Sequence, residues 1–317
     1  MRSAARRSRR ASADPGGRSE PLDTLEHMVV GVGLHPRTGV PDVGSVRAAR
    51  QAAWLASRTG ARVTLLHAAW AEDGSGPVEL AAKAMEELEE LRGLVEADGA
   101  SAAIRIVEDY PWLALCRAAL DDGAELVLAG KRSVAERGRR QIGSTAVKLL
   151  RKCPAPVWLV KPDHDLNHRH VLACTDFSPV TEEALAASAW LAAQSEGELH
   201  LLHGWNLTWS EQRAAADLSE EDYAARVEDA RVRALASLER QADVLDVDPT
   251  LHLERGDPHV QILEKVEQER PDVLVLGSLS KGGRPGFDVG TVAERVLPQV
   301  EESILCFKPK DFVCPVS

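Results

Sequence analysis

The residues best suited to chemistry lie in a glycine-containing segment of the second half of the chain. The segment reads Gly277-Ser-Leu-Ser280, then nine residues, then Gly290-Thr291. Glycine lets backbone amides approach a phosphate closely, and a hydroxyl residue at a helix start adds the positive end of the helix dipole. The segment therefore predicts a site for a phosphorylated ligand. Thr291 and Glu294 also match a capping box, so a purely structural role for Thr291 stays open.

A carboxylate, Asp176, is the second candidate group. It follows the apolar run at 171–175 and precedes Phe-Ser-Pro. In that tripeptide Ser178 is a predicted helix N-cap and Pro179 a predicted first helical residue. A carboxylate at a strand end can accept hydrogen bonds from a ribose, or it can fix the turn. The sequence leaves both roles open.

The first half contains a loop with the same spacing. It reads Gly130-Lys-Arg-Ser133, then nine residues, then Gly143-Ser144. The nine residues are rich in arginine, but exposed charged loops usually only interact with solvent. Gly33 stands where the second half has Asp176. We therefore expect the first half to be mainly a structural partner and any ligand to bind the second half.

These loops are positioned by a pattern of about 140 residues that occurs twice. In each half an apolar run precedes a helix containing Ala-Trp-Leu-Ala, and a second apolar run ends in His67 or His203. We expect both histidines to be satisfied core or edge residues rather than ligands. Further periodic segments predict, in each half, a long helix, a third strand, a helix opened by proline and a last apolar strand. The long helices are expected at 77–97 and 220–242, and the third strands at 104–107 and 250–253. Pro111 and Pro258 open the next helices, and the last strands are Val157–Val160 and Ile304–Phe307.

Strands that alternate with helices predict an α/β fold of two tandem Rossmann-like domains, each a five-stranded parallel sheet flanked by helices. In such sheets ligands bind beyond the carboxyl ends of the strands where the strand order reverses, which would bring Asp176 and Gly277 together. The last strands are apolar and would leave sticky sheet edges, so we expect an internal pseudo-dimer. A homodimer stays open. The expected boundaries are a basic tail at 1–24, domains at 25–162 and 169–310, a linker at 163–168 and a C-terminal tail at 311–317.

The composition narrows the classes of function. The chain is 44% hydrophobic and 27% charged, and its net charge of −11 argues against general binding to nucleic acid or to an anionic membrane. The five cysteines form no CxxC pair and no cluster with metal-ligand spacing, which favours reduced thiols in a cytoplasmic protein. No segment has a recognisable catalytic signature. We therefore predict no catalytic residue and no metal site.

The spacing of the two loops resembles that of universal stress proteins that bind ATP: Gly, two residues, Gly, nine residues, then Gly followed by Ser or Thr. The tandem arrangement and the ending Phe-Lys-Pro-Lys-Asp-Phe-Val-Cys-Pro-Val resemble the E-type, two-domain branch of that family. The chain departs from the pattern at Ser133 and Ser280, which replace the middle glycine. The resemblance implies a stress-response protein that binds ATP or another phosphorylated ligand, with Asp176, Gly277, Ser280, Gly290 and Thr291 as site residues. It also implies pairing through the last strand, and it leaves open a non-catalytic interaction scaffold and a weak ATPase or autokinase.

Overall fold

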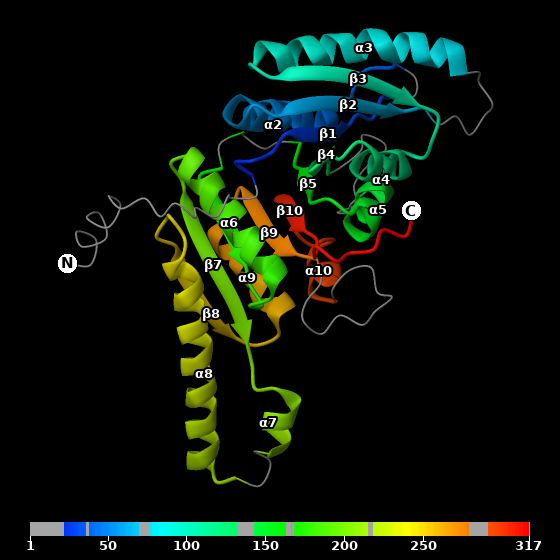
Figure 1. Cartoon of the computed structure of the whole chain (residues 1–317). Helices are drawn as coiled ribbons and strands as arrows, with labels where there is room; N and C mark the ends of the chain where they lie inside the picture. The colour runs from blue at the N-terminus through cyan, green and yellow to red at the C-terminus, as the bar shows by residue number, and fades with distance from the viewer. Residues whose placement is uncertain are drawn as a thin grey trace.

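The computed structural model describes residues 22–35, 38–69, 77–131, 143–162, 166, 168–214, 218–278 and 291–316. Strands alternate with helices along both halves, as the sequence predicts (Figure 1). The first half contains β1 (His27–Gly31), α2 (Val43–Thr59), β2 (Arg62–Ala68), α3 (Pro77–Ala97), β3 (Ser101–Val107), α4 (Pro111–Asp121), β4 (Leu126–Gly130), α5 (Ser144–Lys152) and β5 (Val157–Val160). The second half contains β6 (His170–Cys174), α6 (Pro179–Gln194), β7 (Glu198–Trp205), α7 (Trp209–Ala214), α8 (Glu220–Asp243), β8 (Thr250–Arg255), α9 (Pro258–Glu269), β9 (Val273–Gly277), α10 (Thr291–Val296) and β10 (Ser303–Phe307).

All of these strands belong to one ten-stranded sheet with the order β3-β2-β1-β4-β5-β10-β9-β6-β7-β8. The strands of each half pair in parallel, and the two halves join where β5 and β10 pair antiparallel, with Trp158 opposite Leu305. The apolar last strands therefore meet each other, as expected for strands that would otherwise expose their backbone groups. Both halves repeat the order 3-2-1-4-5, so each has its reversal of strand order between its first and fourth strands.

Local sequence explains where several helices begin and end. Asp42 is the N-cap of α2 and accepts a hydrogen bond from the backbone N–H of Ser45 at 2.7 Å. Gly60 ends the same helix in the left-handed conformation, at φ 77°, which glycine adopts without strain. Pro111 and Pro258 lie in the first turns of α4 and α9, as predicted.

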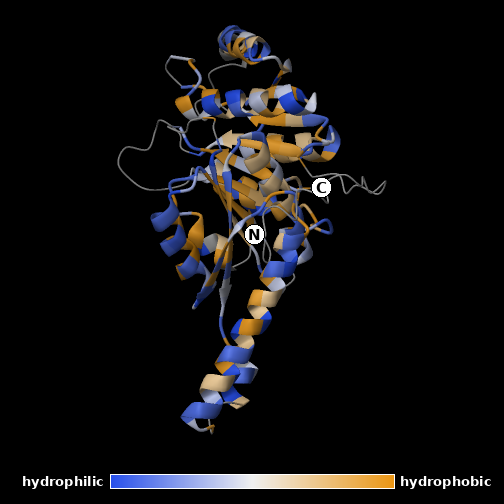
Figure 2. Ribbon diagram, turned by 90° about the vertical axis from the view of Figure 1, so that its left-hand side faces the viewer, coloured by the Kyte–Doolittle hydropathy of each residue, from blue (hydrophilic) through white to orange (hydrophobic). Residues whose placement is uncertain are grey.

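Helices cover both faces of the sheet, and each face has its own apolar core. The helices α2, α3, α6 and α8 pack on one face, and α4, α5, α9 and α10 on the other. Hydrophobic residues concentrate on the central strands, while the outward sides of the helices are more polar (Figure 2). Each core contains residues of both halves. The two domains therefore share their cores across the β5–β10 junction.

Aromatic residues reinforce this junction on one face. The ring of Trp54 in α2 meets the ring of Trp190 in α6 edge to face, with centroids 6.2 Å apart. These are the tryptophans of the repeated Ala-Trp-Leu-Ala segments. His168 is fully buried with its ring centroid 5.2 Å from that of Trp54 and 5.1 Å from that of Trp158. His168, the last residue of the expected linker, is therefore part of the interface between the domains.

Residues at both ends of the described chain are buried. Leu22 is only 2% exposed and belongs to the core with Leu25, so the expected basic tail does not extend to residue 24. Residues 1–21 lie outside the described part. At the other end, Cys314 is buried and its Sγ lies 3.2 Å from the backbone oxygen of Lys152, so the C-terminal segment packs on the first domain. The short helix α7 was not predicted; it lies beside α8, joined to it by an ion pair between Glu211 and Arg233 (Figure 1).

Candidate functional site

The carboxyl ends of β6 and β9 form the candidate site in the second domain. The two strands are parallel neighbours, with Ala173 opposite Val275, so the residues that follow them leave the sheet side by side. Asp176 follows β6, and Gly277 ends β9. The structure thus brings together two of the five predicted site residues. Thr291 is the first residue of α10, while Ser280 and Gly290 lie outside the described residues.

Asp176 is half-buried and fixes the turn that follows β6. Its Oδ1 accepts a hydrogen bond from the backbone N–H of Ser178 at 3.0 Å, which is the geometry of an Asx turn. Ser178 occupies the N-cap position of α6 as predicted, but its side chain makes no capping hydrogen bond. The predicted N-cap position of Ser178 is therefore confirmed, without a capping hydrogen bond from its hydroxyl. Within the described part of the chain, its buried Oγ has no hydrogen-bond partner.

Thr175, which sequence reasoning missed, organises the same turn. Its Oγ1 accepts a hydrogen bond from the backbone N–H of Phe177 at 3.0 Å and lies 2.8 Å from Oε1 of Gln241 in α8. Phe177 has φ 62°, a left-handed conformation that is uncommon for a non-glycine residue. Such conformations persist only where surrounding contacts enforce them, and they cluster at functional sites. Neither feature has a sequence signal, because both depend on the packing of α8 and β7 against the turn.

His203 packs against this turn from the end of β7. Its Nδ1 donates a hydrogen bond to the backbone oxygen of Thr175 at 2.8 Å, and its ring lies 4.1 Å from that of Phe177. In the first domain His67 donates in the same way to the backbone oxygen of Val32 at 2.9 Å. Burial lowers the pKa of both histidines, so both are neutral at pH 7. Their structural role agrees with the expectation from the sequence.

Gly277 allows the N-terminal turn of α6 to approach the end of β9. A Cβ on Gly277 would lie 2.9 Å from Cγ1 of Val180 and 3.2 Å from Cγ2 of Thr181. Gly130 plays the same part in the first domain, where a Cβ would lie 2.7 Å from the backbone carbon of Gly44. These contacts require small residues whether or not a phosphate binds. The glycines at these two positions therefore have a packing explanation as well as a ligand-binding one.

The first domain has a carboxylate at the corresponding place, supplied by a different element. A Cβ on Gly33 would lie 2.7 Å from Oδ2 of Asp42, the N-cap of α2. Burial raises the pKa of Asp42, although hydrogen bonds from Ser45 partly oppose this. In the sequence, Asp42 is recognisable only as a residue type that favours helix N-caps. The two domains therefore differ less in charge than the sequence suggests.

Comparisons with known proteins place this geometry in a family. The family described as Universal stress protein family matches residues 38–161 and 167–308. A universal stress protein of Mycolicibacterium smegmatis is 28% identical over 203 residues, which are 59% of this chain and 63% of that protein. Universal stress protein E of Escherichia coli (strain K12) is 25% identical over 177 residues, covering 53% of this chain and 55% of that protein. The aligned part thus spans less than two thirds of either relative.

Solved structures support the fold over nearly the whole chain. The crystal structure of a functionally unknown protein of Pseudomonas aeruginosa PAO1 has a TM-score of 0.66 at 20% identity and covers 92% of this chain and 96% of that chain. A universal stress protein of Archaeoglobus fulgidus has a TM-score of 0.64 at 19% identity, with coverage of 89% and 98%. No helix among the described residues is long and apolar enough to cross a membrane. Because the family match extends over most of both halves, this chain belongs to the universal stress protein family as a tandem, two-domain member.

Proposed function

We propose that this chain is a stress-response protein whose second domain binds a nucleotide or another phosphorylated ligand at the carboxyl ends of β6 and β9. The observation that carries the proposal is the turn after β6, which lies at the reversal of strand order. There the Asp176 carboxylate, the left-handed Phe177 and the start of the 16-residue helix α6 follow one another. In open α/β sheets this is where ligands bind.

The groups at this turn suit the two parts of a nucleotide. A carboxylate accepts hydrogen bonds from ribose hydroxyls, while the N-terminus of α6 and the buried hydroxyl of Ser178 favour an anion. The second domain also carries the glycine-containing segment 277–291. ATP is one candidate ligand, and Ser280 in place of the middle glycine makes another phosphorylated compound an equal candidate.

The test compares matched asparagine variants of the two domains by titration calorimetry against ATP, ADP, AMP and acetyl phosphate. Asp176→Asn keeps the oxygen that accepts the Ser178 N–H but removes the charge. A charge-assisted hydrogen bond contributes about 1.5–3 kcal/mol, so the affinity should fall about 10- to 100-fold. Asp42→Asn, the equivalent change in the first domain, should leave the affinity unchanged. Equal losses in both variants, or none in Asp176→Asn, would contradict the placement of the site.

A second candidate function is a protein-interaction scaffold with vestigial sites. It is favoured by the structural explanations found for Asp176 and Gly277, since each residue is required by the turn or by helix packing alone. Absence of binding by every compound in the panel would favour the scaffold.

A further inference from the structure

A cluster of histidine and glutamate side chains lies near the amino ends of the strands of the second domain. The turn between β6 and α6 and Gly277 lie at the opposite, carboxyl ends of the strands. His170 is the first residue of β6, and Glu198 is the first residue of β7. His200 lies two residues further along β7, and His252 is the third residue of β8. The cluster has no sequence motif, because its residues lie on separate strands.

The register of the sheet places these side chains on one face. His170 pairs with Glu198, Leu172 with His200, and Leu202 with His252. Because side chains at alternate positions of a strand share a face, all four polar residues point the same way. This is the face covered by α9, because Leu172 and Leu202 share a core with Ile262 of that helix. Glu269, the last residue of α9, extends the cluster from the helix layer that covers this face.

Three of these residues have the spacing of metal ligands. Nδ1 of His200 lies 3.0 Å from Nε2 of His252 and 3.7 Å from Oε2 of Glu269. The three atoms all lie within 4.8 Å of one another. Zinc bonds of about 2.0–2.1 Å in tetrahedral geometry place neighbouring ligand atoms about 3.3 Å apart. These two separations bracket that value, and two imidazoles with one carboxylate form a ligand set that zinc uses.

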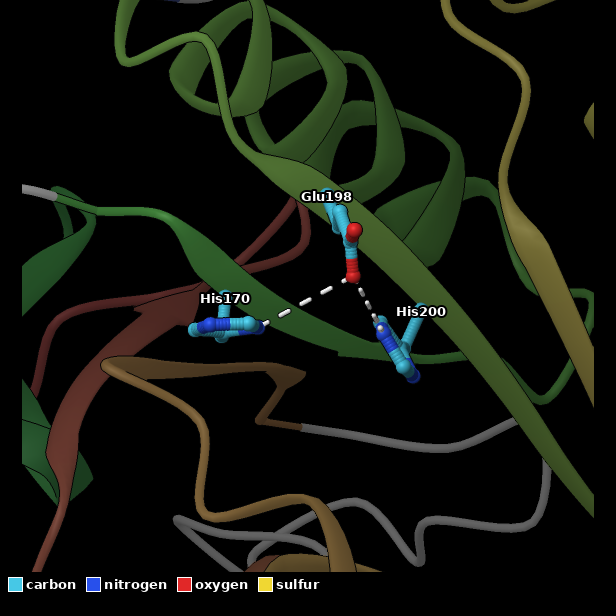
Figure 3. A group of neighbouring side chains, drawn as sticks. All are labelled: His170, Glu198 and His200. Atoms are coloured by element: carbon cyan, nitrogen blue, oxygen red, sulfur yellow. Dashed lines mark ion pairs between the residues drawn. The ribbon is translucent and has the colours of Figure 1, made fainter.

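The other side of His200 faces a looser group. Glu198 reaches from β7 towards both neighbouring histidines, with its Oε2 3.8 Å from Nε2 of His200 and 4.0 Å from Nδ1 of His170 (Figure 3). The side chains of Glu198 and His170 are 73% and 53% exposed, whereas those of His200 and Glu269 are 12% and 31% exposed. Ordering exposed side chains around an ion costs more conformational entropy. The group of His200, His252 and Glu269 is therefore the better-formed site.

The first domain neutralises the carboxylate at the corresponding corner with a guanidinium group. By sheet register and helix position, Arg105 and Asp122 correspond to His252 and Glu269. The guanidinium of Arg105 binds the carboxylate of Asp122 directly. In the second domain Lys265 instead pairs with Glu254, with Nζ and Oε1 3.2 Å apart. A divalent cation between the imidazoles and Glu269 would supply the positive charge that Arg105 supplies in the first domain.

We propose that the second domain binds one zinc-class divalent ion through Nδ1 of His200, Nε2 of His252 and Oε2 of Glu269, with water in the fourth position. The ion ties the edge strand β8 to β7 and to the last turn of α9. It therefore stabilises the outer part of the second domain, independently of any ligand at Asp176. Neutral imidazole and carboxylate ligands are suited to zinc at pH 7.

The test is a zinc titration of the untagged full chain after removal of metal with a chelator, with a chromogenic chelator as competitor. The wild type should bind one equivalent of zinc, and its melting temperature should rise with zinc concentration. His200→Gln and His252→Gln should abolish this binding. Glu269→Gln should weaken the zinc affinity more strongly than the loss of an outer-shell partner does. Such a loss typically costs about 10- to 100-fold in affinity.

His170→Gln is the matched control, since it removes a histidine of the looser group and should leave the zinc affinity unchanged. Melting curves in chelator show which variants are folded, and Glu269→Gln, at an outer helix end, provides the test if a strand variant unfolds. Absence of stoichiometric binding by the wild type would overturn the proposal. Loss of binding in His170→Gln with retention in Glu269→Gln would also overturn it, because the ion would then lie in the looser group.

Discussion

Asp176 and Gly277 each have a structural role as well as a proposed role in ligand binding. A mutation at either position informs about function only if it separates the two roles. Asp176 fixes the turn through Oδ1, and Gly277 makes room for Val180. An alanine at either position changes the local backbone as well as any ligand contact. Conservative replacements, which keep the acceptor or the small volume, are therefore the informative ones. The same argument favours glutamine over alanine at the histidine cluster.

A serine-to-glycine change tests the departure of the second domain from the ATP-binding pattern. Ser280→Gly restores the glycine expected in the middle of the loop, where a side chain narrows the approach of backbone amides to a phosphate. We expect Ser280→Gly to bind ATP more tightly than the wild type, measured by calorimetry at constant magnesium. Ser133→Gly makes the same change in the first domain and should have no effect. Unchanged ATP affinity in Ser280→Gly would show that the serine is not the obstacle.

At the scale of elements, the start of α2 shows how a helix cap and a buried charge oppose each other. Asp42 caps the helix, but burial raises the pKa of its carboxyl group above the ordinary value of 3.8. Because the pKa is raised in the folded state, the protonated carboxyl group of Asp42 favours folding. This contribution to stability is fully present below pH 3.8 and is lost as the pH rises through the folded-state pKa. At pH 7 the half-buried, ionised carboxylate of Asp42 therefore lowers the stability of the fold, and its capping hydrogen bond partly offsets this loss.

Two variants of Asp42 separate the cap from the charge. Asp42→Ala removes the acceptor for the Ser45 N–H and should lower the free energy of unfolding by about 0.5–2 kcal/mol. Asp42→Asn keeps a good N-cap without the charge, so it should be at least as stable as the wild type at pH 7. Urea unfolding at pH 7 and pH 4 measures both variants. A lower stability of Asp42→Asn at pH 7 would mean that the helix dipole outweighs burial.

At the scale of the whole molecule, the two domains behave as one structural unit. Their cores are continuous on both faces, and polar contacts cross the junction. The buried Nζ of Lys131 donates to the backbone oxygen of Val300 at 2.7 Å, and the buried Nζ of Lys308 donates to that of Leu150. Leu150 is in the last turn of α5, where a cation is favourable because it pairs with a carbonyl group that has no partner within the helix. We therefore expect the domains to unfold together.

The N-terminal boundary gives a matched test of what belongs to this unit. A chain beginning at Pro21 lacks the arginine-rich start. Its free energy of unfolding should lie within about 1 kcal/mol of that of the full chain, because no core residue is removed. Leu22→Ala in the full chain should cost about 2–5 kcal/mol, because it leaves a cavity in a core where Leu22 is 2% exposed. Urea unfolding measures both. Similar losses in the two proteins would place core contacts in the first 20 residues.

The sequence alone determined the repeat, the alternation of strands and helices, and the pairing of apolar last strands. It could do so because the periodicity of buried residues and the residues that begin and end helices act over a few neighbouring positions. It also placed Asp176 and Gly277 at the same end of the sheet, because parallel strands bring their carboxyl ends together.

Only the tertiary structure decided which side chains meet across elements. Three arrangements join residues from separate elements. They are the Asp42 carboxylate beside Gly33, the turn organised by Thr175, and the group of His200, His252 and Glu269. Their sequence spacing follows no motif, because the register of the strands and the packing of α9 set the distances. The burial of His168 likewise depends on its contacts with Trp54 and Trp158 of the first domain. Long-range register and packing are therefore what a single sequence does not reveal.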